Sequence, residues 1–342
     1  MKRYLLIIGL AVLILNFLTT IGASGVFASN AKDIKEARKR AEEKLLPLEG
    51  VSGISHDEEA FRIIVYIEDE KYKGKIPDEI EGFKTEVRVT GRIKALSLLQ
   101  LESAVTPQYT YSEPVSRTGK VRPLSGGVSL GVPEKAFGGK MAGTLSIVVF
   151  GPEGGYYILS CAHVIAMDKN AGFLKIGTPV LQPGTYDGGA DGDIVGTLYK
   201  YIPIAFNSIR VKNYADAAIA KLTEANYLVG EVLGDDNQST YTISGTTEVN
   251  VGDLVRKSGR TTGVTENRVA DTTATVKVWY TLSKWAIFRD QIIVEQPFIE
   301  SGDSGSLVDK DGGFVGLAFA GSDTIAVVCK AKYIIQGLGI TV

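Results

Sequence analysis

The stretch Glu300–Val308, ESGDSGSLV, decides how the rest of the chain is interpreted. Two glycines, an aspartate and three serines stand there directly before an apolar run. That composition suits a tight turn between strands. It also suits an exposed serine nucleophile whose turn aims backbone N–H groups at an oxyanion. The second interpretation requires a base elsewhere in the chain, because a serine hydroxyl is a poor nucleophile until its proton is removed.

The chain offers two histidines as a base. His56 lies in SGISHDEEA, a polar stretch beside three acids, and is predicted to be a solvated loop residue. His163 follows an apolar run in LSCAHVI. Taken alone, His163 reads as a core histidine, but it is the candidate base if Ser304 is a nucleophile.

A carboxylate that fixes the imidazole tautomer would complete the arrangement. Asp216 stands in NYADAAIAKL at the head of an apolar strand, where a lone carboxylate is costly to bury without a donor. The alternative is an exposed aspartate at a strand entry, a common turn residue. The order His163, Asp216, Ser304 is one of the known orders of this chemistry.

From Met141 onward the chain alternates short apolar runs with Gly, Asp, Asn or Pro. The 39 glycines of the 342 residues add to this pattern. Many short strands separated by turns indicate an all-β barrel or sandwich. The runs include GTLSIVVFG, GYYILSCAHVI, TPVLQPG, GDIVGTLYKYIPI, DAAIAKL, GDLVRKSGR, ATVKVWY, DQIIVEQP, SGSLVDKDG, FVGLAFAG and TIAVVCKA.

The N-terminus has the layout of a secretory signal peptide, predicted over residues 1–29. Lys2 and Arg3 precede an apolar stretch over 4–18, and small residues follow. A retained membrane anchor is the alternative, but the stretch is short for a full span. We therefore expect a secreted, extracellular protein with no stable membrane span after signal cleavage.

The next region, residues 30–105, is predicted to be a small α+β domain or propeptide. A helix is expected over 31–46, ended by Pro47, and strands over 60–69 and 84–91. The apolar positions of that helix, which share one face, are Ile34, Ala37, Ala41 and Leu45. An inhibitory propeptide, a folding aid and a partner module all remain open as its role.

Residues 106–137 hold prolines, serines and glycines without a period and are predicted to be a linker and the entry to a barrel. Within them, SRTGK (Ser116–Lys120) is a candidate processing site if it is exposed. Residues 138–342 form the remaining unit, the all-β domain. Cys161 and Cys329 both lie in apolar surroundings and are predicted to be buried free thiols.

From about Gly138 the chain resembles the chymotrypsin-fold, trypsin-like serine proteases that bacteria export. SCAHV resembles the family's Thr-Ala-Ala-His segment, ADAAIAKL its Asp-Ile-Ala-Leu segment and GDSGS its Gly-Asp-Ser-Gly-Gly segment. VRKSGRTTGVTENRV also resembles a Lys-Ser-Gly-Arg-Thr-Thr-Gly stretch of some exported members. Each motif is weak alone, but the three in this order are a specific signal.

The resemblance implies two β-barrels side by side with the active site in the cleft. His163 would be the general base and then acid, Asp216 would orient it, and Ser304 would be the nucleophile. The backbone N–H groups of Gly302 and Ser304 would form the oxyanion hole. The function implied is that of an exported serine endopeptidase acting through an acyl-enzyme.

The chain departs from the family pattern in several places. Ser306 stands where the family has glycine. In digestive relatives the residue matching Asp303 pairs with a new N-terminus, but no Ile-Val start precedes the barrel here, so the partner of Asp303 is left open. Phe298 occupies the expected pocket floor, which gives no support for Lys, Arg or Glu recognition. With Gly316 and Ala318 as a wall and strand edge, small or apolar side chains are expected before the scissile bond.

No cofactor is expected. The net charge of −2 gives no basis for nucleic-acid binding. Asp187, Asp191 and Asp193 lie close in sequence, but their spacing suits a turn better than a calcium loop, and no Cys/His cluster indicates zinc. A monomer that binds a protein or peptide substrate is expected.

The main alternative is a catalytically inactive protease-fold protein that binds peptides. A complete set of His, Asp, Ser and Gly-Asp-Ser-Gly favours the enzyme, since a binder has no need of all of them. An α/β-hydrolase esterase is disfavoured because its chain order places histidine last.

Overall fold

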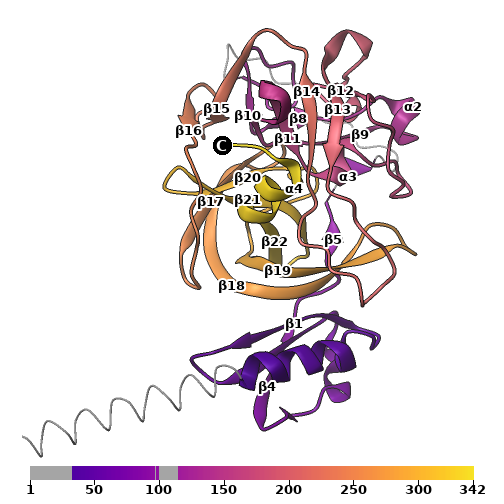
Figure 1. Ribbon diagram of the computed structural model, residues 1–342, viewed down its shortest axis with the longest axis vertical. Coiled ribbons are helices and arrows are strands. Elements are labelled where there is room, and N and C mark those ends of the chain that lie inside the picture. The colour runs from indigo at the N-terminus through magenta and orange to yellow at the C-terminus, as the bar shows by residue number, and fades with distance from the viewer. Residues whose placement is uncertain (1–32, 97, 100–114) are drawn as a thin grey trace, which may run out of the picture.

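The computed structural model describes residues 33–96, 98–99 and 115–342 (Figure 1). The predicted signal peptide, residues 1–29, lies outside the described residues. Within the described ranges, no helix is long and apolar enough to cross a bilayer.

The fold class expected from the sequence is confirmed: two chymotrypsin-like β-barrels follow a small α+β unit (Figure 1). The first barrel is built on an eight-stranded sheet in the order β12-β13-β14-β11-β10-β15-β16, with β7 beside β15. A smaller sheet contributes β8 and β9. These strands are β7 (Leu124–Gly126), β8 (Val128–Leu130), β9 (Met141–Leu145), β10 (Ile147–Phe150), β11 (Tyr156–Ser160), β12 (Pro179–Leu181), β13 (Ile194–Tyr201), β14 (Ala218–Leu222), β15 (Tyr227–Leu233) and β16 (Thr240–Thr242).

The strands of the second barrel follow the order β17-β20-β21-β22-β19-β18. The barrel is closed, because the first strand of this order, β17, pairs both with its neighbour β20 and with the last strand, β18. Its strands are β17 (Leu254–Gly259), β18 (Gly263–Trp279), β19 (Trp285–Glu295), β20 (Leu307–Lys310), β21 (Gly313–Gly321) and β22 (Ile325–Lys330). Short helices α2 (Glu134–Phe137), α3 (Ala162–Ile165) and α4 (Ala331–Leu338) complete the two barrels.

One apolar core runs through both barrels and fixes how they meet. Leu145 and Val164 of the first barrel belong to the same buried cluster as Leu317 and Phe319 of the second. All nine residues of β21 are buried, as expected for a strand that is apolar on both faces. The loops that carry the candidate catalytic residues therefore project from strands with fully packed surroundings.

The N-terminal unit has its own core. A helix over residues 33–45 packs on β1 (Val51–Asp57), β2 (Arg62–Ile67), β3 (Glu79–Ile80) and β4 (Phe83–Val89). The predicted helix face is confirmed, since its four apolar residues are buried in that core. The strands expected over 60–69 and 84–91 are confirmed as β2 and β4.

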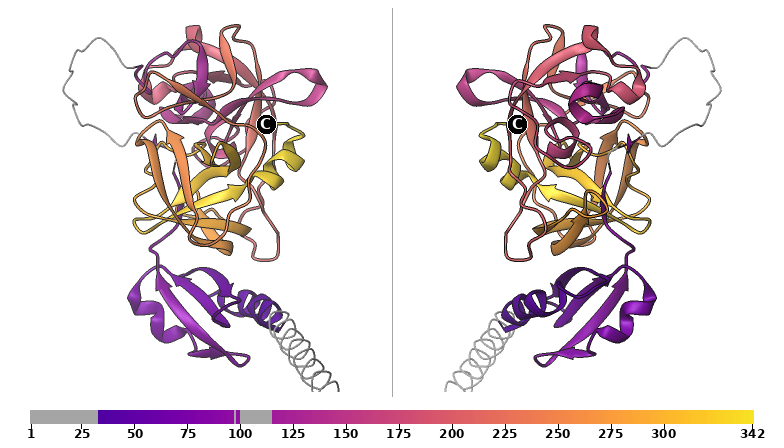
Figure 2. Two further views of the ribbon diagram at one scale, coloured as in Figure 1. Left: turned by 90° about the vertical axis from the view of Figure 1, so that its left-hand side faces the viewer. Right: turned by 90° about the vertical axis from the view of Figure 1, so that its right-hand side faces the viewer.

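The sheet of this unit continues into the second barrel, because β1 pairs antiparallel with β18 (Figures 1 and 2). Polar bonds reinforce the junction: the Tyr66 hydroxyl donates to Asp271 Oδ2 at 2.6 Å, and Lys277 Nζ donates to the Leu46 carbonyl at 2.9 Å. The prediction of a solvated loop for His56 is wrong. The residue lies within β1 at 9% exposure, and burial, followed by the charge of Arg38, lowers its pKa.

Elements of the first barrel already begin within the range 106–137. Within SRTGK, Arg117 is buried at 7% exposure, whereas Ser116 and Lys120 are exposed, so the Arg117 side chain itself is not accessible to a protease. Its guanidinium donates to the carbonyls of Gly127 at 2.9 Å and Gly234 at 2.6 Å and to Ser258 Oγ at 2.7 Å. A segment whose side chain makes this many buried hydrogen bonds is anchored in the barrels, and the sequence pattern did not predict this anchoring.

The β1–β18 junction can be tested at Gly53. A Cβ added there would meet the Thr275 carbonyl oxygen of β18 at 2.6 Å, so Gly53→Ala must push the two strands apart. We expect a loss of about 1–3 kcal/mol in the free energy of unfolding, and faster amide exchange over residues 51–57. Gly74→Ala, in the same unit with open space around it, is the matched control. Equal exchange protection in the two variants would contradict the described junction.

Candidate active site

His163 and Asp216 form a buried pair on the first barrel. His163 lies in α3, which directly follows β11, and Asp216 lies two residues before β14, the strand that pairs with β11. His163 Nδ1 is 2.7 Å from Asp216 Oδ2, and the His163 backbone N–H donates to Oδ1 at 3.1 Å. The carboxylate thus fixes both the orientation and the tautomer of the ring.

Tyr280 is a third member of this group. Its hydroxyl donates to Asp216 Oδ2 at 2.6 Å, and its ring meets the His163 ring edge-on with centroids 5.9 Å apart. Asp216 is 0% exposed, and burial alone would raise its pKa. The charge and N–H of His163, followed by the Tyr280 hydroxyl, nevertheless hold that pKa below its usual value. Asp216 therefore stays ionised inside the protein.

Ser304 lies in a tight turn just before β20 of the second barrel. Gly302 has φ +97°, a left-handed conformation that a side chain would strain. Thr144 of β9 braces the turn across the barrel boundary: its N–H donates to the Ser304 carbonyl at 2.8 Å and its hydroxyl to the Gly302 carbonyl at 2.8 Å. The turn is held from the first barrel as well as from its own strand.

The Ser304 hydroxyl makes no hydrogen bond to His163 here. It donates to the Phe319 carbonyl at 3.1 Å and accepts from the Leu96 N–H at 3.2 Å. His163 Nε2 is buried and has no hydrogen-bond partner among the described residues. An unpaired buried imidazole nitrogen is costly unless a proton donor comes to it.

A segment of the N-terminal unit lies directly on this serine. Strand β5 (Lys94–Ala95) pairs antiparallel with the end of β21, with Ala95 opposite Ala320 and Lys94 opposite Gly321. The next residue, Leu96, has its carbonyl oxygen 2.9 Å from the Gly302 N–H. Two backbone donors are expected at an oxyanion site. The Gly302 N–H donates to the Leu96 carbonyl, whereas the Ser304 N–H donates to no described residue.

A cavity of about 800 Å³ lies beside this segment, and most of its lining is polar or charged, including Arg92, Glu300 and Asp323. Phe298, Ile299 and Gly321 line it together with Leu96, and Leu96 packs against the cluster that holds Phe298 and Ile299. Phe298 thus lines a cavity, and its role as the floor of a substrate pocket stays a prediction. Ala318 belongs to the same apolar cluster.

Gly316 lies inside the sheet, paired with Lys330 and Val308. The strand edge that pairs with β5 is at Ala320 and Gly321, within the stretch GLAFAGS (Gly316–Ser322) that was expected to supply such an edge. The role of Gly316 and Ala318 toward a substrate stays a prediction.

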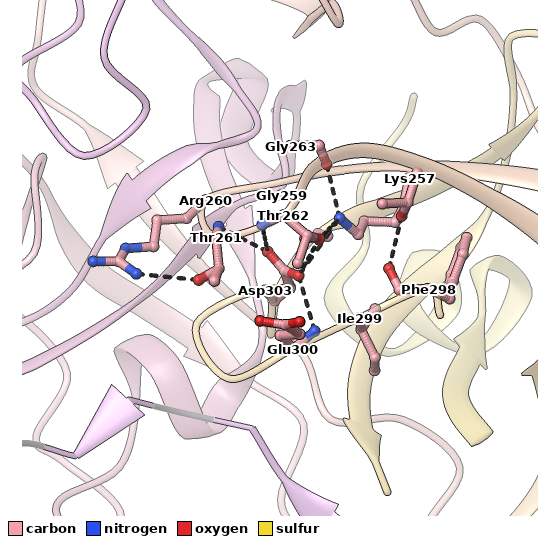
Figure 3. A network of polar contacts seen from close by, with 12 residues as sticks. Lys257, Gly259, Arg260, Thr261, Thr262, Gly263, Phe298, Ile299, Glu300 and Asp303 are labelled. Atoms are coloured by element: carbon pink, nitrogen blue, oxygen red, sulfur yellow. Dashed lines mark hydrogen bonds and ion pairs between the residues drawn. The ribbon is translucent and has the colours of Figure 1, made fainter. Parts of the chain in front are cut away.

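Asp303, whose partner the sequence left open, is satisfied inside the second barrel (Figure 3). It is 0% exposed and accepts from the N–H groups of Thr261 at 2.8 Å and Glu300 at 3.0 Å and from the Thr262 hydroxyl at 2.6 Å. Lys257 Nζ, also 0% exposed, lies 3.5 Å from its carboxylate. Burial lowers the pKa of Lys257 to about 8, although Asp303 acts in the opposite direction. The Lys-Ser-Gly-Arg-Thr-Thr-Gly stretch thus supplies the counter-charge.

The acidic loop is engaged in ion pairs. Asp187 accepts from Arg260 Nε at 2.9 Å and from the Ser129 hydroxyl at 2.6 Å, and Asp193 lies 2.9 Å from Lys120 Nζ. Asp191 begins the short 3-10 turn that contains Asp193. These contacts agree with a turn rather than a calcium loop.

One group of metal-ligand atoms lies close together in the described part of the chain: Cys161, His163 and Asp216, within 4.8 Å of one another. The short bond between His163 Nδ1 and Asp216 needs a proton between those two atoms, so the same atoms cannot both hold an ion in this arrangement. Burial also raises the pKa of the Cys161 thiol well above its usual value. Both cysteines are free and buried, as predicted.

Comparisons with known proteins find likeness in structure alone. No family model and no curated protein matches the chain. Among solved structures, the Nocardiopsis protease NAPase is 15% identical with a TM-score of 0.45, covering 64% of this chain and 97% of its own. Thermobifida fusca Protease A is 17% identical, TM-score 0.45, with 64% and 96% covered. A glutamic acid-specific serine protease that uses a histidine triad in substrate binding is 20% identical, TM-score 0.46, with 64% and 100% covered.

The Lys257–Asp303 pair can be tested by removing the cation. Lys257→Met leaves a fully buried carboxylate without its counter-charge, and we expect a loss of about 3 kcal/mol in the free energy of unfolding at pH 7. Lys71→Met, which breaks a surface pair with Asp69 at 3.8 Å, should cost less than about 1 kcal/mol. Lys257→Met with Asp303→Asn should recover part of the loss. Equal stabilities for the two single variants would refute the buried pair.

The same pair predicts a pH dependence. Because the pKa of Lys257 is about 8 in the folded chain against an ordinary 10.5, the folded state binds fewer protons than the unfolded state between these values. This group therefore makes the free energy of unfolding rise from pH 8 to pH 10.5. Denaturant titrations should show a shallower rise in Lys257→Met than in the wild type over that window.

Proposed function

We propose that the chain is a serine endopeptidase in which Ser304 is the nucleophile, His163 the general base and acid, and Asp216 the residue that orients His163. The observation that carries the proposal is a peptide carbonyl, that of Leu96, on the Gly302 N–H directly beside the Ser304 hydroxyl. The buried His163–Asp216 pair leaves Nε2 as the free nitrogen of the ring. The proposed oxyanion hole consists of the N–H groups of Gly302 and Ser304.

In the proposed mechanism, the Ser304 hydroxyl turns from the Phe319 carbonyl to His163 Nε2, which takes its proton as Oγ attacks the carbonyl carbon. Negative charge develops on the carbonyl oxygen, where the backbone donors stabilise it. Asp216 and Tyr280 stabilise the imidazolium that forms. His163 then protonates the leaving amine, and a water molecule hydrolyses the acyl-enzyme by the same route.

The substrate would bind as an added strand on the edge at Ala320 and Gly321, as β5 does. Leu96 packs against the apolar cluster that holds Phe298 and Ile299, so an apolar side chain is expected just before the scissile bond. We further propose that the enzyme is exported, from the signal-peptide pattern of residues 1–29. A monomer and the absence of nucleic-acid binding remain predictions.

One observation favours the second candidate, an inactive peptide-binding protein. The Ser304 hydroxyl is bonded away from His163, and a strand of the same chain fills the site. The two candidates differ in whether Ser304 is activated, because both predict a strand bound at this edge.

Labelling with a fluorophosphonate probe tests the proposal, since the probe reacts with an activated serine and needs no known substrate. We expect an adduct on Ser304 in the wild type. A larger extent is expected in Leu96→Glu, because a carboxylate placed against the apolar cluster of Phe298 and Ile299 is costly and favours release of the segment from the serine. Ser304→Ala is the control and should lose labelling and lower peptide hydrolysis at least about a thousandfold. No adduct in either the wild type or Leu96→Glu would support the inactive binder.

Tyr280 should act as a positioning residue for the pair. Tyr280→Phe removes a donor to the Asp216 carboxylate, which raises the pKa of Asp216 and leaves the carboxylate less firmly positioned on His163. We expect kcat/KM to fall roughly tenfold, with its acidic limb moved to higher pH and KM little changed. Tyr333→Phe, whose hydroxyl binds Asp290 instead at 2.6 Å, is the matched control. An unchanged pH profile in Tyr280→Phe would contradict this role.

A further inference from the structure

We propose that the site selects peptides with positively charged side chains two and four residues before the side chain that takes the place of Leu96. The inference rests on the proposed endopeptidase function and names the class of substrate that the site accepts. The groups that recognise the two cations are the carboxylates of Glu300 and Asp323, which line the cavity beside β5.

The bound strand presents every second side chain to this cavity. Side chains of an extended strand alternate between two faces. Arg92, Lys94 and Leu96 accordingly line the cavity of about 800 Å³. The residues between them face elsewhere, since Ile93 is 0% exposed and Ala95 lines a separate cavity of about 50 Å³. A peptide bound in the same way would therefore present three alternate side chains to the larger cavity.

The register of the strand brings Arg92 level with Asp323. The pairing of β5 with β21 is antiparallel and, continued for two residues beyond its last pair, places position 92 opposite position 323. The two segments still contact each other there, because the Thr324 hydroxyl donates to the Thr90 carbonyl at 3.1 Å. A cation four residues before the Leu96 position thus lies along the segment that carries this carboxylate.

The wall of the cavity that belongs to the second barrel presents negative charge. Apart from residues of the bound segment itself, the charged residues of the described lining are Glu300 and Asp323. Both are exposed, and neither carboxylate forms a hydrogen bond or an ion pair within the described part of the chain. The buried ammonium of Lys257 is balanced by Asp303, so it does not neutralise this wall.

In the intact chain the N-terminal unit balances one of the strand's two cations itself. Arg92 forms an ion pair with Glu68 at 3.0 Å, and its guanidinium lies 4.7 Å from the centre of the Trp279 ring. Lys94 has no ion pair among the residues that the structure describes. A separate peptide brings no counterpart of Glu68, so the acids of the cavity wall are left to balance both of its cations.

The test compares three acetylated pentapeptide p-nitroanilides on the full-length chain. Arg-Ile-Lys-Ala-Leu, the sequence of residues 92–96, is compared with Gln-Ile-Gln-Ala-Leu and Glu-Ile-Glu-Ala-Leu. We expect kcat/KM for the basic peptide to exceed that for the neutral peptide about threefold or more, and that for the acidic peptide about tenfold or more, at low salt. Both ratios should shrink in about 0.5 M sodium chloride. Because β5 competes with all three peptides alike, its occupancy cancels from the ratios.

Two variants remove the charges while conserving side-chain size. Glu300→Gln and Asp323→Asn should each lower the ratio between the basic and the acidic peptide, and the double variant should bring it within about twofold of one. Glu266→Gln is the matched control, because Glu266 is an exposed acid on β18 of the same barrel that does not line this cavity. Wild-type ratios in the double variant, or an equal change in Glu266→Gln, would overturn the assignment.

A binding measurement separates this inference from the proposed function. Fluorescein-labelled carboxamides of the same three peptides are titrated against Ser304→Ala, where no turnover occurs, and we expect the same order of affinity. A wild type that labels with the fluorophosphonate but cuts the three peptides equally, or prefers the acidic one, overturns this inference and leaves the endopeptidase standing. Absence of labelling in the wild type and in Leu96→Glu, together with tightest binding of the basic peptide, overturns the proposed function and assigns the charge preference to a peptide-binding protein.

Discussion

A fully buried carboxylate needs hydrogen-bond donors that balance its charge. Asp216 is such a carboxylate. Its donors come from three directions: the ring and the backbone of His163 on α3, and the hydroxyl of Tyr280 just beyond β18. The first two belong to one barrel and the third to the other. The buried charge of Asp216 therefore ties the two barrels together, in addition to the apolar core that runs through both.

Local patterns predicted a large part of the fold. The helix of the N-terminal unit followed from Ile34, Ala37, Ala41 and Leu45, and most barrel strands followed from apolar runs between turn residues. The motifs around His163, Asp216 and Ser304 indicated which residues to bring together. Contacts between residues far apart in the sequence could not be predicted from these local patterns. Nothing in VWYTLS marks Tyr280 as a partner of Asp216, and a Pro- and Gly-rich stretch gave no sign that Arg117 is buried. The sequence pattern predicted only the end of the long strand β18, because polar residues fill its first half.

The N-terminal unit is attached largely through main-chain pairing, which explains why its attachment left little trace in the sequence. Strand β1 joins β18, β5 joins β21, and β6 (Leu98–Leu99) joins β9. Hydrogen bonds of this kind require an extended backbone and a free edge rather than particular side chains. Side chains add to this attachment at a few positions: the Tyr66 hydroxyl donates to Asp271, and Leu96 packs against the apolar cluster beside Phe298.

The ion pair of Lys257 and Asp303 has a consequence for timing. Because both charges come from within the second barrel, the turn that presents Ser304 owes nothing to a freshly made chain end. The turn that presents Ser304 is therefore complete as soon as the chain has folded, without any cut in the chain. Latency would then come from occupancy of the site rather than from an unfinished turn, and its duration would be set by how fast the bound strand of the same chain leaves the site, a rate that temperature changes and dilution does not.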